Sequence, residues 1–228
     1  RGLGDVYKRQ LRNHIGMLYY NTVTPLLKNA LEKLMLAEVL KPFRLVGGTS
    51  LSLQLGHRES VDIDLFTDLA YNTVDFKTIE EYLTLNFPYV STSNIDLVGF
   101  GKSFYIGDSE LDYVKLDLYY TDPFIRPVKE IDNIRLADIE DIIAMKLDVV
   151  SHNGRKKDFW DLHELLEQYS ISQMLEFYFE RYPYGASKDQ ILKNLIEFEY
   201  ADNDADPNCL RGKYWDLIKL DFIELLEQ

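Results

Sequence analysis

The chain has little of what several protein classes require. It contains a single cysteine, Cys209, among 228 residues, which excludes an intrachain disulfide and a thiolate zinc cluster. No apolar run approaches the roughly 20 residues that a membrane-spanning helix needs, and no segment has the form of a secretory signal. We therefore expect a soluble, cytoplasmic protein without a membrane partner, in which any metal is held by oxygen.

Positive charge is also scarce, with 25 lysines and arginines against 38 aspartates and glutamates and a net charge of −13. Such a chain repels polyanions at long range, so a broad nucleic-acid-binding face is not expected. The densest local basic patch is Arg155, Lys156 and Lys157 in "GRKKDFWD". The alternative for that patch is a solvated helix start.

The first ten residues, "RGLGDVYKRQ", are set apart from the rest. The stretch from Asp5 to Gln10 resembles the translation of a transposon end that is used to make sequencing libraries. We exclude residues 1–10 from the reasoning on fold and function, and expect the native start at Met17 or upstream of it.

Apolar periodicity divides the remaining chain into two parts. A mixture of helices and strands predicts an α+β domain with a mixed sheet over residues 11–130, and a helical region follows over 131–228. Thr24 and Pro25 have the form of a helix cap and first turn. The helices are expected over 11–40, 49–57, 75–86, 136–151, 156–168, 172–181, 187–198 and 214–227, the strands over 44–46, 61–66, 91–100, 103–106 and 111–120, and an acidic loop over 201–208.

Two aspartates alternate with apolar residues in "VDIDLF". Residues two apart on a strand point to the same face, so Asp62 and Asp64 bring their carboxylates close together. Unpaired, they repel each other and have raised pKa values, unless a cation lies between them. Mg²⁺ is the natural cation, since it takes hard oxygen ligands and substrate phosphates. The alternative is a pair of exposed strand charges.

A Gly-Gly turn precedes this strand. Gly47 and Gly48, followed by Thr49 and Ser50, offer free backbone N–H groups and a hydroxyl at a helix start, which suits a phosphate. A plain tight turn is the alternative. A third acid, Asp117 in "YVKLDLYY", is expected to reach the same metals from a neighbouring strand. It would share the face of Lys115 and Tyr119 only with a bulge in the strand, and more simply pairs with Lys115 on the opposite face. Two metal ions about 4 Å apart then align an attacking hydroxyl and a leaving pyrophosphate.

The order Gly-Gly-Thr-Ser, Asp-Ile-Asp and a separate Asp resembles the nucleotidyltransferase fold of the DNA polymerase β superfamily. Within it, "GGTSLSLQLGHRESVDIDLF" closely resembles the AbiEii/AbiGii toxin family, and "DIIAMKLDVVSHNGRKKDFWDLHELL" is similar to that family's downstream signature. The match spans Leu45 to Leu166. Val149 stands where the family often has a small residue, three positions after the motif lysine.

The resemblance implies a role for each matching position. The triphosphate would be held by Gly47, Gly48 and Thr49 or Ser50, and magnesium by Asp62 and Asp64, with Asp117 as a third metal ligand and general base. Lys146 would neutralise phosphate charge, and Asp158 would orient the nucleotide or activate the acceptor. Asp161 is expected to pair with Arg155 or Lys157 on its own helix, and His57 to be a surface or supporting residue.

The function implied by the resemblance is a magnesium-dependent nucleotidyltransferase. It would move a nucleoside monophosphate from a nucleoside triphosphate to an acceptor hydroxyl, as the toxin of an abortive-infection (phage defence) or type IV toxin-antitoxin system. The partners would be an RNA acceptor such as tRNA and a cognate antitoxin. Transfer to a small molecule or a protein side chain, and a non-catalytic nucleotide-binding module, remain as alternatives.

Overall fold

The computed structural model describes residues 16–92 and 100–226. Within these residues seven strands form one sheet in the order β3-β4-β5-β2-β1-β7-β6. The strands are β1 (Arg44–Leu45), β2 (Asp62–Thr67), β3 (Tyr89–Thr92), β4 (Gly101–Ser109), β5 (Asp112–Tyr120), β6 (Lys129–Ile131) and β7 (Ile134–Leu136).

The sheet is mixed, as the α+β prediction requires. β2 pairs with β5 in parallel and with β1 antiparallel, and β1 in turn pairs with β7 in parallel. The predicted antiparallel meander is confirmed for β3, β4 and β5. Of the strand expected over 91–100, the part from 93 to 99 lies outside the described residues.

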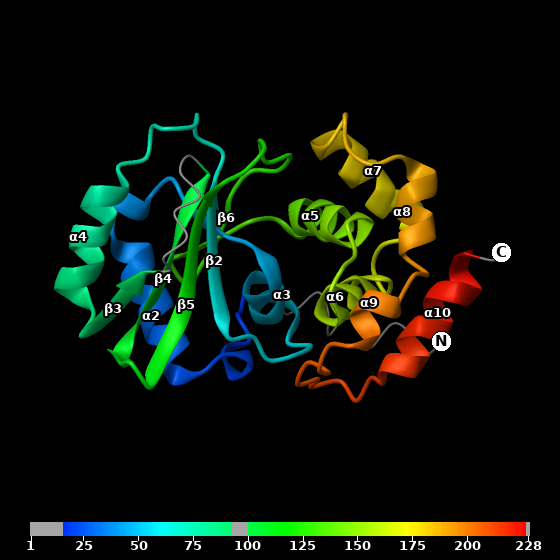
Figure 1. Ribbon diagram of the computed structural model, residues 1–228, viewed down its shortest axis with the longest axis horizontal. Helices are drawn as coiled ribbons and strands as arrows, with labels where there is room; N and C mark the ends of the chain where they lie inside the picture. The colour runs from blue at the N-terminus through cyan, green and yellow to red at the C-terminus, as the bar shows by residue number, and fades with distance from the viewer. Residues whose placement is uncertain (1–15, 93–99, 227–228) are drawn as a thin grey trace.

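Helices α2 (Pro25–Leu36) and α4 (Phe76–Asn86) cover one face of the sheet, away from the other helices (Figure 1). α2 begins as predicted, because the Thr24 hydroxyl accepts a hydrogen bond from Leu27 N and Pro25 occupies the first turn. Asp75 caps α4 by accepting from two backbone N–H groups. The buried faces of these helices and of the sheet form one apolar core.

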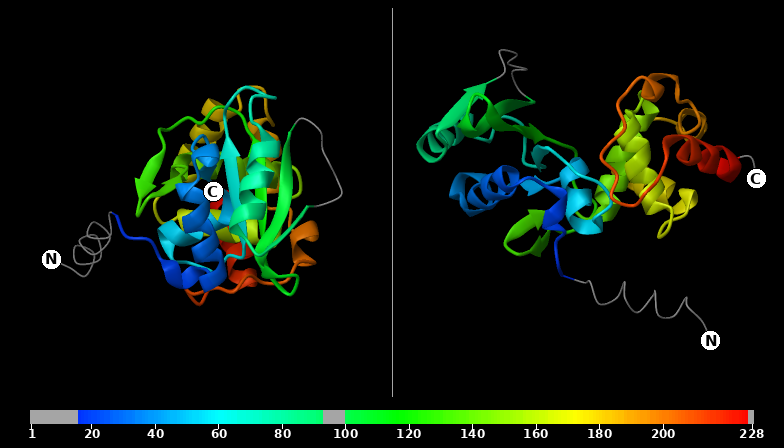
Figure 2. Two further views of the ribbon diagram at one scale, coloured as in Figure 1. Left: turned by 90° about the vertical axis from the view of Figure 1, so that its left-hand side faces the viewer. Right: turned by 90° about the horizontal axis from the view of Figure 1, so that it is seen from below.

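The remaining helices form a second core beyond the opposite face of the sheet. Figure 2 shows the two halves as separate masses of chain with α3 between them. None of the described helices is long and apolar enough to span a membrane. These helices are α3 (Gly47–Leu55), α5 (Ile139–Ser151), α6 (Lys156–Leu165), α7 (Ile171–Arg181), α8 (Lys188–Asn194), α9 (Glu199–Asp202) and α10 (Trp215–Leu226).

The sheet continues past the predicted limit of the first domain at residue 130. Residues 129–136 form the β6–β7 hairpin, where one helix was expected to begin at Leu136 and no strand was expected. Asp132 and Asn133 turn the chain with positive φ angles of 52° and 62°. α9 likewise occupies the start of the expected 201–208 loop.

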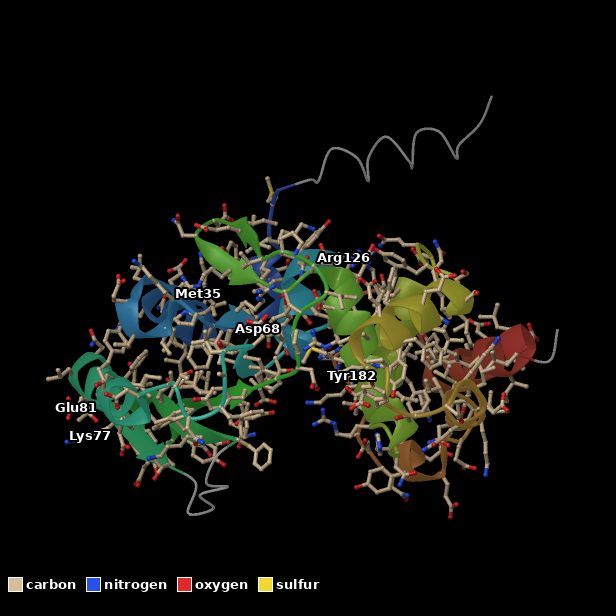
Figure 3. All side chains as sticks on the ribbon, turned by 90° about the horizontal axis from the view of Figure 1, so that it is seen from above. Met35, Asp68, Lys77, Glu81, Arg126 and Tyr182 are labelled. Atoms are coloured by element: carbon tan, nitrogen blue, oxygen red, sulfur yellow. The ribbon has the colours of Figure 1, made fainter. Side chains whose placement is uncertain are left out.

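Contacts at several places tie the halves together, and two of them rest largely on backbone groups. Near one end of the sheet, Arg181 of α7 pairs with buried Asp141 of α5 at 2.8 Å and donates to the carbonyls of Asp122 and Pro123. Arg126, which bonds Glu180, lies at this junction, whereas Lys77 lies on the far surface of α4 (Figure 3).

The second contact brings the chain beyond α9 back to the segment before β2. Glu59 N donates to Asn208 O and Leu210 N donates to His57 O, both at 2.9 Å, around a bridge between Arg58 and Cys209. The segment that leads into the Asp-Ile-Asp strand is therefore held by backbone bonds from the C-terminal half.

Candidate active site

The acidic face of β2 meets the same face of β5. In the parallel register Asp62 lies beside Lys115 and Asp64 beside Asp117, while Ser103 of β4 lies beside Asp117 on its other side. Neighbours in register share a face, so the three predicted acids occupy adjacent positions on two central strands. The structure thus brings Asp117 next to Asp64. Lys115 and Asp117 share this face without a bulge between them, contrary to the expectation, because residues two apart on a strand point the same way.

The glycine turn, Gly47 and Gly48, lies against Asp64 of this acidic face. Val46 N donates to Asp64 O at 2.9 Å, and α3 begins at the next residue without a side-chain cap. Gly47 has a φ of 67°, and a Cβ there would collide with the Asp64 carboxylate; a Cβ at Gly48 would collide with the Arg58 guanidinium. The uncapped N–H groups of α3 therefore open beside Asp64, where a helix terminus favours an anion.

The hydroxyls of Thr49 and Ser50 do not take part in this opening. Both residues are fully buried. The Thr49 hydroxyl donates to the carbonyl of Asp62 and lies 2.8 Å from Ser60 Oγ, from which it can accept, and Ser50 Oγ accepts from Gln54. Thr49 thereby fixes α3 to the start of β2, so a phosphate at this turn would meet backbone N–H groups instead of these hydroxyls.

A cavity of about 150 Å³ lies between the glycine turn, β2, α5 and the start of α6. Six of the predicted site residues line it: Gly47, Gly48, Asp62, Asp64, Lys146 and Asp158. Asp117, Thr49 and Ser50 are not in its lining. A larger cavity of about 790 Å³ lies between α2 and the β4–β5 hairpin, but none of the predicted site residues lines it, so we place the site at the smaller one.

Arg155 and Lys157 also line the small cavity, opposite the acidic strand. They form one wall of an adjoining cavity of about 220 Å³, whose other wall is Asp204, Ala205 and Pro207. Burial and the neighbouring Arg155 lower the pKa of Lys157. Of the local basic patch that the sequence indicated, Arg155 and Lys157 lie at this cavity with Asp62 and Asp64, whereas Lys156 is buried and pairs with Asp206 at 2.9 Å.

A buried ionic network supports the α6 side of the cavity. Lys146 Nζ lies 2.6 Å from Asp158 Oδ1 and 2.7 Å from Asp161 Oδ2. Arg58 donates to both oxygens of Asp161, at 2.6 and 2.8 Å, and His57 Nε2 lies 2.8 Å from the same carboxylate. All five side chains are buried.

This network corrects the prediction for Asp161. Its partners are Arg58 and Lys146, not Arg155 or Lys157, because its face of α6 packs against the segment before β2. Burial alone would raise the pKa of Asp161, but Lys146 and Arg58 hold it well below its usual value. Burial likewise opposes the charge on Lys146, yet Asp158 and Asp161 keep its pKa raised. The network is ionised at neutral pH, and His57 supports it from a buried position.

The carboxylates of β2 and β5 have less compensating positive charge nearby than the carboxylates of α6. Burial, followed by the charges of Asp117 and Asp62, raises the pKa of Asp64 to about 6. The nearest cation to Asp62 is Lys157 at 3.7 Å. Asp117 accepts from Lys115 and from the Ser103 hydroxyl, each at 2.6 Å, and Tyr119 OH lies 2.9 Å from that hydroxyl.

The donor set suits a hard divalent cation at Asp62 and Asp64. Both carboxylates line the cavity, and the raised pKa of Asp64 marks negative charge without enough compensation. Mg²⁺ commonly uses one or two carboxylates together with substrate phosphates. In the part of the chain that the structure describes, no group of three or more histidine, cysteine, aspartate or glutamate residues is arranged to hold a metal.

Known proteins resemble this chain in sequence. Residues 29–228 match the family model described as "Nucleotidyl transferase AbiEii toxin, Type IV TA system". An uncharacterized protein of Aquifex aeolicus (strain VF5), aq_aa25, is 27% identical over 200 residues, which cover 84% of this chain and 90% of that protein.

Solved structures share the fold. MenT4, the nucleotidyltransferase toxin Rv2826c of Mycobacterium tuberculosis H37Rv, has a TM-score of 0.58 and 12% identity, over 89% of this chain and 83% of that one. JHP933 of Helicobacter pylori has a TM-score of 0.53 and 20% identity, over 87% of this chain and 90% of that one. At these identities the likeness establishes the arrangement of strands and helices.

Proposed function

Since the chain belongs to the AbiEii nucleotidyltransferase toxin family, we propose that it transfers a nucleoside monophosphate from a nucleoside triphosphate to an acceptor hydroxyl, with Mg²⁺ and with release of pyrophosphate. The observation that carries the proposal is the shared cavity. Its walls combine an uncapped helix N-terminus at Gly47 and Gly48 with two carboxylates, Asp62 and Asp64, and burial and the neighbouring acids raise the pKa of Asp64 to about 6.

The residues of the glycine turn and of α6 would bind the triphosphate between them. Backbone N–H groups at the start of α3 donate to phosphate oxygens, and Arg155 and Lys157 offer positive charge from the opposite wall. When bound at Asp62 and Asp64, Mg²⁺ supplies charge stabilisation and alignment of the phosphates. Asp64 is the carboxylate that gains most from such a cation, because it is the one with the raised pKa.

Lys146 and Asp158 are proposed in a modified role. The sequence assigned phosphate neutralisation to Lys146, but its ammonium already bonds two carboxylates. We assign to this pair the positioning of α6 and its cationic residues against the cavity. Asp158 supports this role, since it accepts from Arg155 N at 3.1 Å and from Arg155 Nε at 3.2 Å.

For the acceptor we propose an RNA end such as that of tRNA, and for regulation a cognate antitoxin. The family description of a type IV toxin-antitoxin system supports both. The adjoining cavity, walled by Arg155 and Lys157, supports an acceptor that carries phosphate. The net charge of −13 is the observation that favours the second candidate, transfer to a protein side chain or a small molecule.

Transfer of radiolabelled nucleotide tests the proposal. Each of the four nucleoside triphosphates is offered with total RNA and, separately, with total protein, in Mg²⁺ or in a chelator. We expect label in one acceptor pool, abolished by chelation and by the Asp62→Ala, Asp64→Ala double substitution. Asp189→Ala, on the exposed side of α8, serves as the matched control. Equal labelling by the wild type and the double variant would reject the assignment.

A further inference from the structure

Lys115 lies on the same face of the sheet as the three carboxylates. On β5 it precedes Asp117 by two residues, and across the parallel pair it stands in register with Asp62, next to the Asp64–Asp117 pair. Residues two apart and residues in register share one face of a sheet. The only basic residue on these two strands is therefore surrounded by Asp62, Asp64 and Asp117.

The contact with Asp117 is close and leaves that carboxylate fully engaged. Lys115 Nζ lies 2.6 Å from Asp117 Oδ2, and the Ser103 hydroxyl donates to Oδ1 at 2.6 Å. The Asp117 side chain is only 17% exposed, whereas Lys115 is 39% exposed. In the described chain, by contrast, no ion pair within 4.0 Å involves Asp64, and the Lys157 ammonium is 3.7 Å from Asp62.

This difference divides the three acids into two groups. Asp62 and Asp64 face the cavity with oxygens that no close cation occupies. Asp117 is outside the lining of that cavity, and both of its oxygens have partners. A second divalent ion that bridged Asp64 and Asp117 would have to bind directly beside this ammonium or displace it from its ion pair. Such displacement is opposed by the pair itself and by repulsion between two cations.

We propose that the Lys115 ammonium takes the place of one of two divalent ions, so that the chain binds a single ion, at Asp62 and Asp64. The inference rests on the proposed function, because it concerns the same site. A lysine ammonium is a compact point charge with three N–H donors. It compensates the charge of Asp117 without the coordination sphere that a second Mg²⁺ would require.

The number of bound ions tests this directly, with Mn²⁺ as the probe. Free Mn²⁺ is counted by its electron paramagnetic resonance signal during titration of the metal-free protein at pH 7.5. We expect one bound ion per chain in the wild type and two in Lys115→Met, which keeps the length of the side chain and removes its charge. Lys115→Arg should keep the count at one, and Lys115→Met combined with Asp117→Asn should return it to one.

Lys102→Met is the matched control. Lys102 lies on the adjacent strand β4 and pairs at 2.7 Å with Glu80 of α4, on the opposite face of the sheet. Its removal changes the net charge equally but leaves the acidic face intact, so the count should stay at one. Circular dichroism and thermal unfolding of each variant verify that it is folded before the ions are counted.

The outcomes separate this inference from the proposed function. Equal ion counts in the wild type and Lys115→Met overturn the inference, whatever the number. A second ion in Lys115→Met that persists after Asp117→Asn overturns it as well. Failure of the proposed function has a different signature, because Asp62→Asn with Asp64→Asn would then leave both Mn²⁺ binding and nucleotide transfer at the wild-type level.

Discussion

At the scale of single residues, the three carboxylates of the acidic face differ in how their charge is balanced. Asp117 has an ion pair and a hydroxyl donor, and Asp62 has a more distant lysine. The pKa of Asp64 is raised to about 6 by burial and by its acidic neighbours. A charged side chain that destabilises the folded protein when no ligand is present, but that would bind a ligand, is typical of a functional site.

Replacement of Asp64 by asparagine should therefore stabilise the metal-free protein at neutral pH. The folded chain binds the Asp64 proton more tightly than the unfolded chain, so this carboxyl's favourable contribution is full below pH 3.8 and is lost as the pH rises through about 6. Allowing for solvent screening, Asp64→Asn should raise the free energy of unfolding by about 1–2 kcal/mol at pH 7.5.

Urea unfolding at pH 7.5 and at pH 4, in a chelator, measures this effect. The gain should shrink at pH 4, where the wild-type carboxyl is largely protonated. Asp108→Asn, on the exposed tip of β4, should show no comparable gain. A loss of stability in Asp64→Asn at pH 7.5 would contradict the assignment of Asp64 as an uncompensated charge.

Gly47 is required both for its backbone conformation and for the space that it leaves beside Asp64. Alanine at Gly212 serves as the control that separates these two requirements. The φ of Gly47 is 67°, and a Cβ there would meet the Asp64 carboxylate; Gly212 has the same φ but nothing within 4 Å of a Cβ. Alanine at Gly212 should lower the free energy of unfolding by about 1 kcal/mol through backbone strain alone. Alanine at Gly47 should exceed that loss and reduce nucleotide transfer at least tenfold, because it displaces Asp64.

Chemical denaturation and the labelled-transfer assay, run on both glycine variants, provide the measurement. Equal losses of stability with unchanged transfer would mean that only the backbone conformation matters at Gly47.

At the scale of elements, the parts that the sequence predicted are those with strong local signals. α2 and α4 carry caps and apolar periodicity, and β2 alternates strictly. The β6–β7 hairpin was missed because its strands have three residues each, too few to show a period. The Asp132-Asn133 turn, with both φ angles positive, was the one available signal, since such turns join two-residue hairpins.

The candidate site likewise has one part that the sequence predicted and another that it did not. Asp62, Asp64 and the glycine turn share a short stretch of chain, so spacing alone brought them together. The pairing of Arg58 with Asp161 joins residues 103 positions apart, and only the packing of α6 decides it. The burial of the Thr49 hydroxyl, too, depends on the register between α3 and β2, which a linear motif does not contain.

Within α6, Asp161 should be the residue whose neutralisation is most damaging. Asp161→Asn leaves Arg58 and Lys146 buried with insufficient negative charge, and should lower the free energy of unfolding by about 3–5 kcal/mol. The pKa of Asp161 is well below its usual value in the folded chain, so its stabilisation is full above pH 3.8 and is lost as the pH falls through the lower value.

The difference between wild type and Asp161→Asn should therefore be large at pH 7 and diminish in acid. Denaturant unfolding across this range measures it. Asp216→Asn, at a side chain 92% exposed on α10, should change the free energy of unfolding by less than about 0.5 kcal/mol. An effect of Asp161→Asn as small as that of the control would refute the role of the network.

At the scale of the whole molecule, the two apolar cores share one helix. Leu53 of α3 belongs to the core of the sheet, while Leu51 and Leu55 of the same helix belong to the core of the helical half. Backbone bonds from residues 208–210 to residues 57–59 add a second link. Neither half can lose its packing without exposing part of the other, so we expect them to unfold together.

The two tryptophans of the chain make this testable. Trp160 and Trp215 stack at 6.4 Å within the helical half, so fluorescence reports that half while far-ultraviolet circular dichroism reports both. The two transitions should coincide. Ile63→Ala, in the sheet, should lower the free energy of unfolding by about 2–4 kcal/mol, and by the same amount in both signals. Leu36→Ala, at a side chain that is 78% exposed, should change neither value. Fluorescence unaffected by Ile63→Ala would show two independent units.

The place of β2 within the sheet has a consequence on a different timescale. β2 pairs with β5 along its whole length and with β1 at Leu65 and Phe66, and in such a central strand hydrogen exchange proceeds mainly through rare, extensive opening. We therefore expect the backbone amides of this strand, which carries Asp62 and Asp64, to be among the slowest to exchange in the protein. The two carboxylates should accordingly keep their positions over times that are long compared with the opening of exposed segments.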